Sequence, residues 1–510
     1  MSLLRSAARG GVALGASQTF ATALGWVRTL VLARLLVPED FGLVGLCTVL
    51  LGFLGALSDM GLTAATIQRK ELTDGHRDAA FWMSISMGAV LFLASIAAAP
   101  ALAAFYGEPR VVSLVLVSAL PLLVGPFAST HAALLRRDLR FGRVAAIEAG
   151  RNVAASAATL GLAASGAGYW SLVFGPLASH LVSVVAYTLS SSFRPRFRAT
   201  WTHARELFSF SAYVAGASAI NYLSANMDYM IVGKRLGTAA LGTYTFAYET
   251  MTFPLTRIAA LFSQVMFPAF ATIQDKLDEM RETYLKITRA VAIVSFPILA
   301  WVAVVAPELV ALLYGPRWLP AVGPLRALSV AGALKAVGTL VGIIFKSRGK
   351  PAVELYWNIA WLVGLTVALV VGVRWGTLGV AVSISILCVP GTLFTEWLAC
   401  RYIDMKLSRL LGVLVVPTVA VAVATAAGGI ARLELATLLP AGVVGDVARL
   451  VGLTLIMLLV YVATLRVIHP PITAEVRAFL GYFKRDKKAP AKAPAVAEAP
   501  AEETAPKEAL

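Results

Sequence analysis

The chain is divided along most of its length into apolar stretches of about 20 residues, separated by short polar turns. A helix needs about 20 apolar residues to cross a hydrocarbon layer of about 30 Å. We find about fourteen such stretches, and they predict helices near residues 10–36, 41–65, 80–103, 111–135, 143–164, 169–190, 206–233, 240–268, 288–313, 320–345, 353–373, 376–400, 408–430 and 447–468. With 58% hydrophobic and 14% charged residues, the composition excludes a soluble domain. The sequence therefore predicts an all-α, polytopic membrane protein.

The connections between the predicted helices are too short to hold a folded soluble domain, so the function is expected within the membrane. The first stretch is not a cleaved signal peptide, because it is too long, contains Arg28 and runs directly into the next stretch. Residues 487–510 are rich in Ala, Pro, Lys and Glu, a composition that predicts a disordered tail.

Positive charge is concentrated in alternate connections. The net charge is +16, and most of the 44 Lys and Arg residues lie on one side once the helices are assigned to alternating directions. Cytoplasmic loops of membrane proteins carry such an excess, so we expect a bacterial inner-membrane protein with both termini in the cytoplasm. The same distribution argues against nucleic acid as a partner. Binding of anionic membrane lipids is an alternative use of part of the charge.

Two turns about 200 residues apart resemble each other. The chain reads Arg34-Leu-Leu-Val-Pro-Glu-Asp-Phe-Gly42 at the first and Lys234-Arg-Leu-Gly-Thr-Ala-Ala-Leu-Gly242 at the second. Further along, Phe105-Tyr-Gly107 returns as Leu313-Tyr-Gly315, and Gly168-Tyr-Trp-Ser-Leu-Val173 faces Gly376-Thr-Leu-Gly-Val-Ala381. Three matches in the same order predict an internal repeat of six helices.

An even number of helices gives both copies the same orientation in the membrane, a plan typical of transporters with the substrate path between the two halves. We therefore expect an N-terminal six-helix lobe (1–200), a C-terminal six-helix lobe (201–404), two additional helices (405–470) and a largely disordered cytoplasmic tail (471–510).

Three segments resemble a known family. They are Ala33-Arg-Leu-Leu-Val-Pro-Glu-Asp-Phe-Gly-Leu-Val-Gly45, Ser58-Asp-Met-Gly-Leu62 with Ile67-Gln-Arg-Lys70, and Thr252-Phe-Pro-Leu-Thr-Arg-Ile258 running to Phe267-Pro-Ala-Phe-Ala-Thr-Ile-Gln274. They are similar to the Wzx-type polysaccharide repeat-unit flippases of the multidrug/oligosaccharidyl-lipid/polysaccharide (MOP) exporter superfamily. The resemblance covers residues 10 to 470 approximately.

The resemblance implies a flippase that moves undecaprenyl-diphosphate-linked oligosaccharide to the outer leaflet for O-antigen, capsule or exopolysaccharide export. It also implies alternating access. Acidic groups inside the spans lead us to expect coupling to H⁺ or Na⁺, with no other cofactor, and a polysaccharide polymerase and glycosyltransferases are candidate further partners. Two alternatives from the same superfamily stay open: a peptidoglycan-precursor lipid flippase and a drug/cation antiporter.

Enzymatic activity is not expected. The sequence has no Gly-x-x-x-x-Gly-Lys-Ser/Thr phosphate-binding loop, no Asp-x-Asp, no His-Glu-x-x-His and no Gly-x-Ser-x-Gly. The three cysteines, Cys47, Cys388 and Cys400, have no metal-like spacing and are expected to be buried apolar side chains, so no metal site is expected.

Charged residues inside the predicted helices are the candidate site residues. A charge there costs about 2.5–3.5 kcal/mol on insertion scales unless it faces a partner or water. Because guanidinium and ammonium groups bind phosphate oxygens, we assign five cations to the diphosphate of the substrate. They are Arg28, Arg151, Arg257, Arg326 and Lys335. Snorkelling or ion pairing is the alternative for each of them, and Glu148 is an i,i+3 partner for Arg151.

Two buried carboxylates and one histidine are the candidates for ion coupling or gating, namely Asp228, Glu249 and His180. Arg28 and Asp228 are repeat-equivalent, opposite in charge and similar in expected depth. They are therefore predicted to form a bridge between the lobes, the alternative being that each pairs within its own lobe or merely lines water.

Overall fold

The computed structural model describes residues 2–58, 62–69, 71–198, 200, 221–272, 276–347, 351–440 and 442–470, without the side chains of some helical residues. All regular structure in these ranges is helical. The N-terminal half contains α1 (Ser2–Leu35), α2 (Pro38–Ser58), α3 (Leu62–Gln68), α4 (Asp74–Tyr106), α5 (Arg110–Ser118), α6 (Leu120–Val124), α7 (Pro126–Arg137), α8 (Phe141–Ala164) and α9 (Trp170–Ser190).

The C-terminal half begins with the helical residues 221–236. It continues with α11 (Thr238–Thr272), α12 (Leu277–Leu313), the 3₁₀ helix η1 (Pro316–Ala321), α13 (Val322–Gly338), α14 (Val341–Ser347), α15 (Pro351–Gly372), η2 (Val373–Trp375) and α16 (Gly376–Tyr402). The last two helices are α17 (Leu407–Leu438) and α18 (Val443–Ile468). The predicted tail, 471–510, and the first part of the predicted span 206–233 lie outside the described residues.

Within the described ranges, eight helical stretches are long and apolar enough to cross a membrane. One of them, Tyr356–Tyr402, contains both α15 and α16. A polytopic, all-helical membrane protein is therefore confirmed, whereas the count of about fourteen spans stays a prediction.

Two predicted spans are interrupted. The span predicted at 111–135 consists of α5, α6 and α7, with Pro121 near the start of α6 and Pro126 at the start of α7. Proline cannot donate the backbone hydrogen bond that would continue the preceding helix, so each one starts a new helix. The span predicted at 320–345 is likewise divided into η1, α13 and α14.

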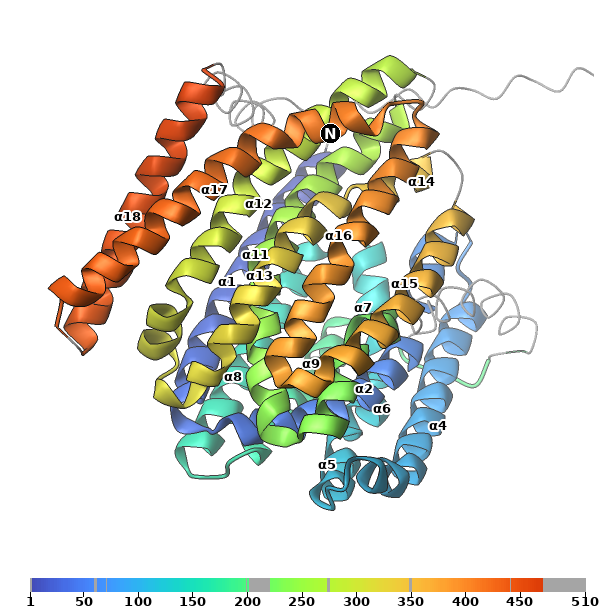
Figure 1. The fold of residues 1–510 in the computed structure, drawn as a ribbon. Helices are drawn as coiled ribbons and strands as arrows, with labels where there is room; N and C mark the ends of the chain where they lie inside the picture. The colour runs from blue at the N-terminus through green and yellow to red at the C-terminus, as the bar shows by residue number, and fades with distance from the viewer. Residues whose placement is uncertain are drawn as a thin grey trace, which may run out of the picture.

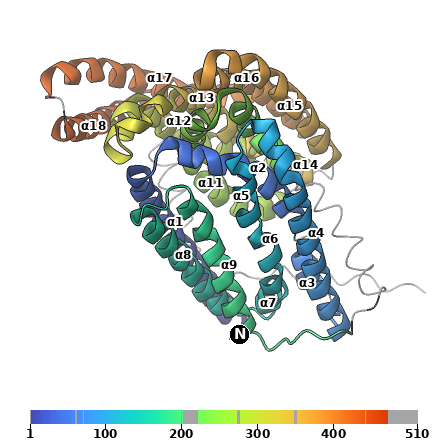
Figure 2. The same cartoon turned by 90° about the horizontal axis from the view of Figure 1, so that it is seen from below.

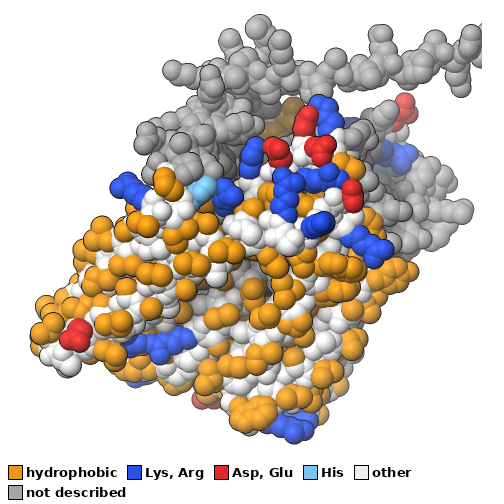
Figure 3. Space-filling view, turned by 45° about the horizontal axis from the view of Figure 1, so that its top comes forward, with side chains coloured by type: hydrophobic (Ala, Val, Ile, Leu, Met, Phe, Trp, Pro, Cys, Tyr) orange, Lys and Arg blue, Asp and Glu red, His pale blue; other side chains and the backbone are white. Residues whose placement is uncertain are grey.

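The charged side chains gather at one end of the molecule, above a broad apolar band (Figure 3). This basic end holds the end of α7 and the starts of α12 and α15, and the start of α12 lies at the top of Figure 1. The opposite end holds the turns α1–α2, α4–α5 and α12–η1, and we call it the turn end. Seen from below, the two halves lie side by side (Figure 2).

The two halves meet where α2 crosses α11 near the turn end. A Cβ atom added to Gly42 would lie 1.7 Å from the carbonyl oxygen of Thr238, and one added to Gly242 would lie 1.8 Å from that of Pro38. Only glycine permits backbones to approach this closely. These are the two glycines that end the repeated motif, so the repeated turn provides the contact between the halves.

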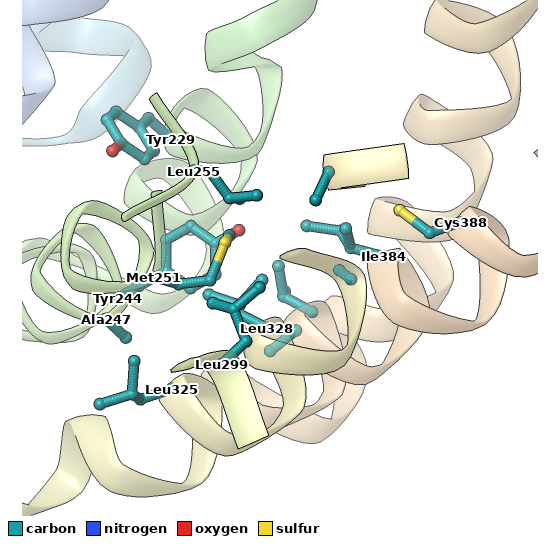
Figure 4. Close-up of a cluster of buried hydrophobic side chains, with 14 of the residues drawn as sticks. Tyr229, Tyr244, Ala247, Met251, Leu255, Leu299, Leu325, Leu328, Ile384 and Cys388 are labelled. Atoms are coloured by element: carbon teal, nitrogen blue, oxygen red, sulfur yellow. The ribbon is translucent and has the colours of Figure 1, made fainter. Parts of the chain in front are cut away.

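The largest apolar core continues from this crossing into the C-terminal half. It packs side chains of α11, α12, α13 and α16, among them Met251, Leu299, Leu328 and Ile384 (Figure 4). All three cysteines are buried, as expected.

The last two helices attach to α12, on the far side from the N-terminal half (Figures 1 and 2). Arg432 of α17 forms an ion pair of 3.1 Å with the buried Glu308 of α12. The Trp301 indole donates to Thr454 Oγ1 of α18 over 2.9 Å. The Tyr461 hydroxyl donates over 2.8 Å to the carbonyl of Ile293, which would otherwise accept from residue 297, a proline without an N–H.

We predict that Gly42→Ala and Gly242→Ala each destabilise the protein by about 1–3 kcal/mol, because the added methyl group forces α2 and α11 apart. Gly150→Ala is the matched control, since a Cβ there meets nothing within 4 Å. It should leave stability unchanged or raise it by about 0.5–1 kcal/mol through helix propensity. Thermal unfolding of the purified variants measures this, and equal stability of all three would contradict the close crossing.

Candidate functional site

A cavity lies between the two halves, lined by α1 on one side and α11 on the other. Its volume is about 270 Å³. Arg28 of α1 and Glu249 of α11 are its charged residues, and Trp26 and Phe253 form an edge-to-face aromatic contact at 4.6 Å between their ring centroids beside them. Tyr314, which follows α12, completes the aromatic lining. The cavity thus combines one cation, one carboxylate and several aromatic rings.

The two charges of this inter-half cavity face open space. Arg28 is half-buried and Glu249 is exposed. Neither has a hydrogen bond or an ion pair with any residue that the structure describes. Arg28 is the half-buried one of the two, and a partly buried charge without a partner is expensive, which favours a functional role for it.

Two cations close the contact between the halves at the turn end. Arg34, at the end of α1, donates through Nε to the carbonyl of Leu313 over 3.3 Å and through a terminal nitrogen to that of Leu312. Lys234, at the end of helical residues 221–236, donates to the carbonyl of Phe105 in the last turn of α4 and lies 4.9 Å from the centroid of its ring. Carbonyls in the last turn of a helix have no partner within the helix, so each cation caps a helix of the other half.

These contacts are reciprocal. Arg34 and Lys234 begin the two copies of the first repeated motif, and Phe105 and Leu313 begin the two copies of the second. Each half therefore supplies one cation and one helix end, which the repeat places in equivalent positions. Both motifs are visible in the sequence, each with a cation at the end of an apolar run, but the sequence alone assigns these residues no role.

Further polar contacts reinforce the turn end. The Trp318 indole donates over 2.9 Å to the carbonyl of Ala33, a free helix end of α1. Arg110 binds Glu108 over 2.8 Å and Glu39 of the α2 first turn over 2.8 Å. The hydrogen bond from Arg110 holds the pKa of Glu108 below its usual range. Glu39 is therefore part of a surface ion network.

Asp228 is buried in the C-terminal half within a cluster of tyrosines. Its Oδ2 accepts from the Tyr244 hydroxyl over 2.7 Å, and its Oδ1 accepts from the backbone N–H of Tyr229 over 3.0 Å. Lys335 interacts electrostatically with Asp228 and contacts Tyr248, with Nζ 3.5 Å from the hydroxyl and 5.3 Å from the ring centroid. The ring centroids of Tyr229 and Tyr248 lie 5.9 Å apart. The carboxylate and the ammonium group thus belong to one network.

The predicted bridge between Arg28 and Asp228 is not formed in this structure. Both oxygens of Asp228 bind partners of its own half, and Arg28 faces Glu249 across the cavity instead. Repeat equivalence does not predict the partners, because Tyr244 of the neighbouring α11 and the backbone N–H of Tyr229 satisfy Asp228 within its own half. The contact between the halves is made by Arg34 and Lys234, one and a half turns further along the same helices.

Arg151 and His180 lie within the N-terminal half, away from the inter-half cavity. Arg151 pairs with Glu148 over 3.3 Å, which confirms the predicted i,i+3 pair, and donates to Ser179 Oγ over 3.2 Å. Glu148 also accepts from the Tyr187 hydroxyl over 2.8 Å. His180 packs beside Gly125. This polar cluster connects α8 with α9.

Arg326 has a structural partner. Its Nε donates over 3.0 Å to the carbonyl of Ala303 on the adjacent α12. That carbonyl would normally accept from residue 307, which is a proline. Arg326 thus satisfies an acceptor that Pro307 leaves free, and it does not line the inter-half cavity.

The two remaining candidate cations lie in the C-terminal half. Arg257 is part of α11, two turns beyond Glu249, but its side chain lies outside the described residues. Lys335 lines a second cavity of about 400 Å³ together with Asn358, Trp357 and Trp361. Of the five cations assigned from the sequence, the structure thus places Arg28 alone in the described lining of the inter-half cavity.

An apolar groove of about 750 Å³ runs between α12, α13, α16 and α17. Its lining consists mainly of aliphatic side chains such as Leu299, Val330, Leu411 and Val415. Such a surface suits a hydrocarbon chain rather than a polar solute.

Comparisons with known proteins agree on the class. The model of the polysaccharide biosynthesis protein family matches residues 31–323. The teichuronic acid biosynthesis protein TuaB of Bacillus subtilis is 29% identical, over 69% of this chain and 73% of the relative. The lipopolysaccharide biosynthesis protein WzxC of Escherichia coli is 26% identical, over 74% of this chain and 77% of the relative. The succinoglycan biosynthesis transport protein ExoT of Rhizobium meliloti is 25% identical, over 71% of this chain and 73% of the relative.

Two solved structures share the fold. The inward closed conformation of the lipid II flippase MurJ aligns with a TM-score of 0.70 at 12% identity, over 91% of this chain and 100% of that one. An inward-facing multidrug resistance MATE family transporter of the MOP superfamily aligns with a TM-score of 0.57 at 16% identity, over 76% and 96%.

We predict that Arg326→Leu lowers the free energy of unfolding by about 1–3 kcal/mol, because the Ala303 carbonyl loses its donor. The same substitution in a Pro307→Ala background should cost much less, since residue 307 then supplies the N–H. Thermal unfolding of the four proteins in this double-mutant cycle measures the coupling. Additive effects would show that Arg326 acts elsewhere.

Proposed function

Because the chain belongs to the family of polysaccharide biosynthesis proteins, we propose that it is a flippase for undecaprenyl-diphosphate-linked oligosaccharide repeat units. The repeat unit would cross the bacterial inner membrane for the export of O-antigen, capsule or exopolysaccharide. The single observation that carries this proposal is the inter-half cavity, in which Arg28 has no partner among the described residues.

The cavity chemistry fits the head of such a lipid. A guanidinium group binds phosphate oxygens through two parallel hydrogen bonds, and a charge-assisted bond of this kind contributes about 1.5–3 kcal/mol. The aromatic faces of Trp26 and Phe253 beside Arg28 offer apolar surfaces to sugar rings. For the isoprenoid chain, the apolar groove along α12, α13, α16 and α17 offers a matching wall.

Alternating access is the mechanism that we propose for translocation. The glycine crossing of α2 and α11 and the caps by Arg34 and Lys234 hold the halves together at the turn end. In the proposed cycle, with the basic end cytoplasmic, these contacts are the outer gate. They are made at two equivalent places, so they would break together when the lobes rock.

Asp228 and Glu249 are our candidates for coupling to H⁺ or Na⁺. Glu249 opens into the proposed substrate cavity, and both carboxylates interact electrostatically with Tyr229. Protonation or cation binding at Glu249 would remove the negative charge beside Arg28 and so change its attraction for a diphosphate. Lys335 supplies a built-in cation to Asp228, which favours Glu249 as the group that exchanges an ion.

The peptidoglycan-precursor flippase is the second candidate, favoured by the structural likeness to MurJ. Both substrates carry a polyprenyl diphosphate, so Arg28 serves either. The discriminating measurement is which lipid-linked saccharide accumulates when the protein is lost.

The function is tested in a strain that lacks this protein. We predict that it accumulates undecaprenyl-diphosphate-linked repeat units on the cytoplasmic side, and that the wild-type chain restores export. Arg28→Gln should reduce export about tenfold or more, because the diphosphate loses a charged donor. Arg374→Gln removes an exposed cation elsewhere and is the control. Arrested wall synthesis with accumulated peptidoglycan precursor would favour the second candidate instead.

The gate is tested by thiol labelling of Thr29→Cys, a residue that lines the inter-half cavity. We predict that Arg34→Ala or Lys234→Ala raises labelling by an impermeant reagent applied from the turn-end side, and that the double variant raises it further. Arg34→Lys keeps a charged donor at this position, so Thr29→Cys should be labelled less in that variant than in Arg34→Ala. Unchanged labelling in both alanine variants would show that these cations do not hold the gate.

A further inference from the structure

A second concentration of charge lies at the basic end of the N-terminal half, far along the chain from the cavity residues. It surrounds a hollow of about 450 Å³ between the start of α4, the end of α7 and the segment after α9. The side chains that line it include Arg77, Arg140, Arg194, Arg196 and Arg198, together with Asp74, Asp78 and Asp138. We call it the arginine hollow.

The backbone of the segment after α9 is fixed in place. The N–H of Arg196 donates over 3.0 Å to the buried Asp78 of α4, and its carbonyl accepts over 3.0 Å from the Trp82 indole. Trp82 also stacks on Phe197 with the ring centroids 4.4 Å apart. The arginine hollow therefore has a defined wall on this side, independent of the Arg196 side chain.

The carboxylates and carbonyls around the hollow are used by only some of its arginines. Asp74 pairs with Arg77 over 3.2 Å and with Arg198 over 3.5 Å. Arg194 donates to the carbonyls of Ser191 and Phe193, both over 2.8 Å. Two of the three acidic side chains are therefore engaged: Asp74 pairs with these arginines, and Asp78 accepts from the backbone N–H of Arg196.

Donors remain after these pairs are made. The guanidinium of Arg196 has no partner in the part of the chain that the structure describes, and Arg140 reaches Asp138 only at 3.9 Å. Nε of Arg77 is buried without a hydrogen-bond partner in the described ranges. The lining thus offers more arginine donors than its described carboxylates and carbonyls accept, which suits an anionic ligand.

The position of the hollow identifies the acceptor. Three candidate spans end around it, at Asp74, Arg137 and Ser190, which places it at the level of lipid phosphates whichever side faces the cytoplasm. Phe197 is 87% exposed and stacks on Trp82, as aromatic residues do at a membrane interface. Arginine binds phosphate oxygens bidentately.

We propose that the arginine hollow binds the phosphate headgroup of an anionic phospholipid of the surrounding leaflet, with Arg140 and Arg196 as its free donors. The bound lipid would bridge α7 to the segment after α9. This site is separate from the inter-half cavity and does not depend on the proposed transport function.

The test uses the purified full-length protein and native mass spectrometry with equal amounts of phosphatidylglycerol and phosphatidylcholine. We expect one phosphatidylglycerol to be retained in preference to phosphatidylcholine. Arg140→Gln/Arg196→Gln should weaken that retention about thirtyfold, since each of the two cations near a membrane surface contributes about 1 kcal/mol. Lys276→Gln/Lys286→Gln removes two exposed cations near the start of α12, at the same end of the molecule, and should leave retention unchanged.

Equal losses in the two double variants, with unchanged unfolding temperatures, would show general attraction of charge and overturn the proposal. Equal retention of the two phospholipids would overturn it as well. A third measurement adds undecaprenyl diphosphate. If undecaprenyl diphosphate displaces phosphatidylglycerol from the wild-type protein, and Arg140→Gln/Arg196→Gln abolishes this displacement, the hollow binds the transported lipid. That result would overturn its assignment to a phospholipid of the bilayer.

Discussion

The need to satisfy backbone carbonyls in apolar surroundings controls this structure. Helix ends and prolines leave carbonyls without an intrahelical donor, and lipid cannot supply one. In this chain the donor comes from another helix: Arg34 and Lys234 at the ends of α12 and α4, and Tyr461 and Arg326 beside the prolines of α12. The positions of whole helices, including α18 and the contact between the halves, depend on these bonds.

Much of the fold follows from the sequence because hydrophobic length and repetition are local signals. The predicted spans 41–65 and 408–430 correspond to α2 and α17, and the repeated turns are the places where the halves meet. Pro121 and Pro126 are visible in the sequence, and a proline inside a span marks a place where the helix can bend. What the sequence could not show is that α5, α6 and α7 are separate helices, because that depends on how neighbouring helices pack around each proline.

The candidate site was less predictable for a physical reason. A charged residue inside a span indicates that a partner, a cavity or water is present, but it does not say which. Arg28 faces a cavity, Arg151 an acidic neighbour and Arg326 a proline-freed carbonyl, although all three look alike in the sequence. Asp228 binds the Tyr244 hydroxyl of a different helix and the backbone N–H of Tyr229. Because neither partner is charged, the sequence does not reveal them, and it favours a bridge to a cation instead.

The reciprocal caps also define the symmetry of the contact between the halves. Each half carries a cation that the other half's helix end accepts, and each carries a glycine at the crossing. Residues that contact one another in both directions define an isologous interface, the kind that relates the subunits of a two-fold homodimer. Each half thus supplies both a donor and an acceptor, so the contact has the two-way arrangement of an isologous interface although both of its sides belong to one chain.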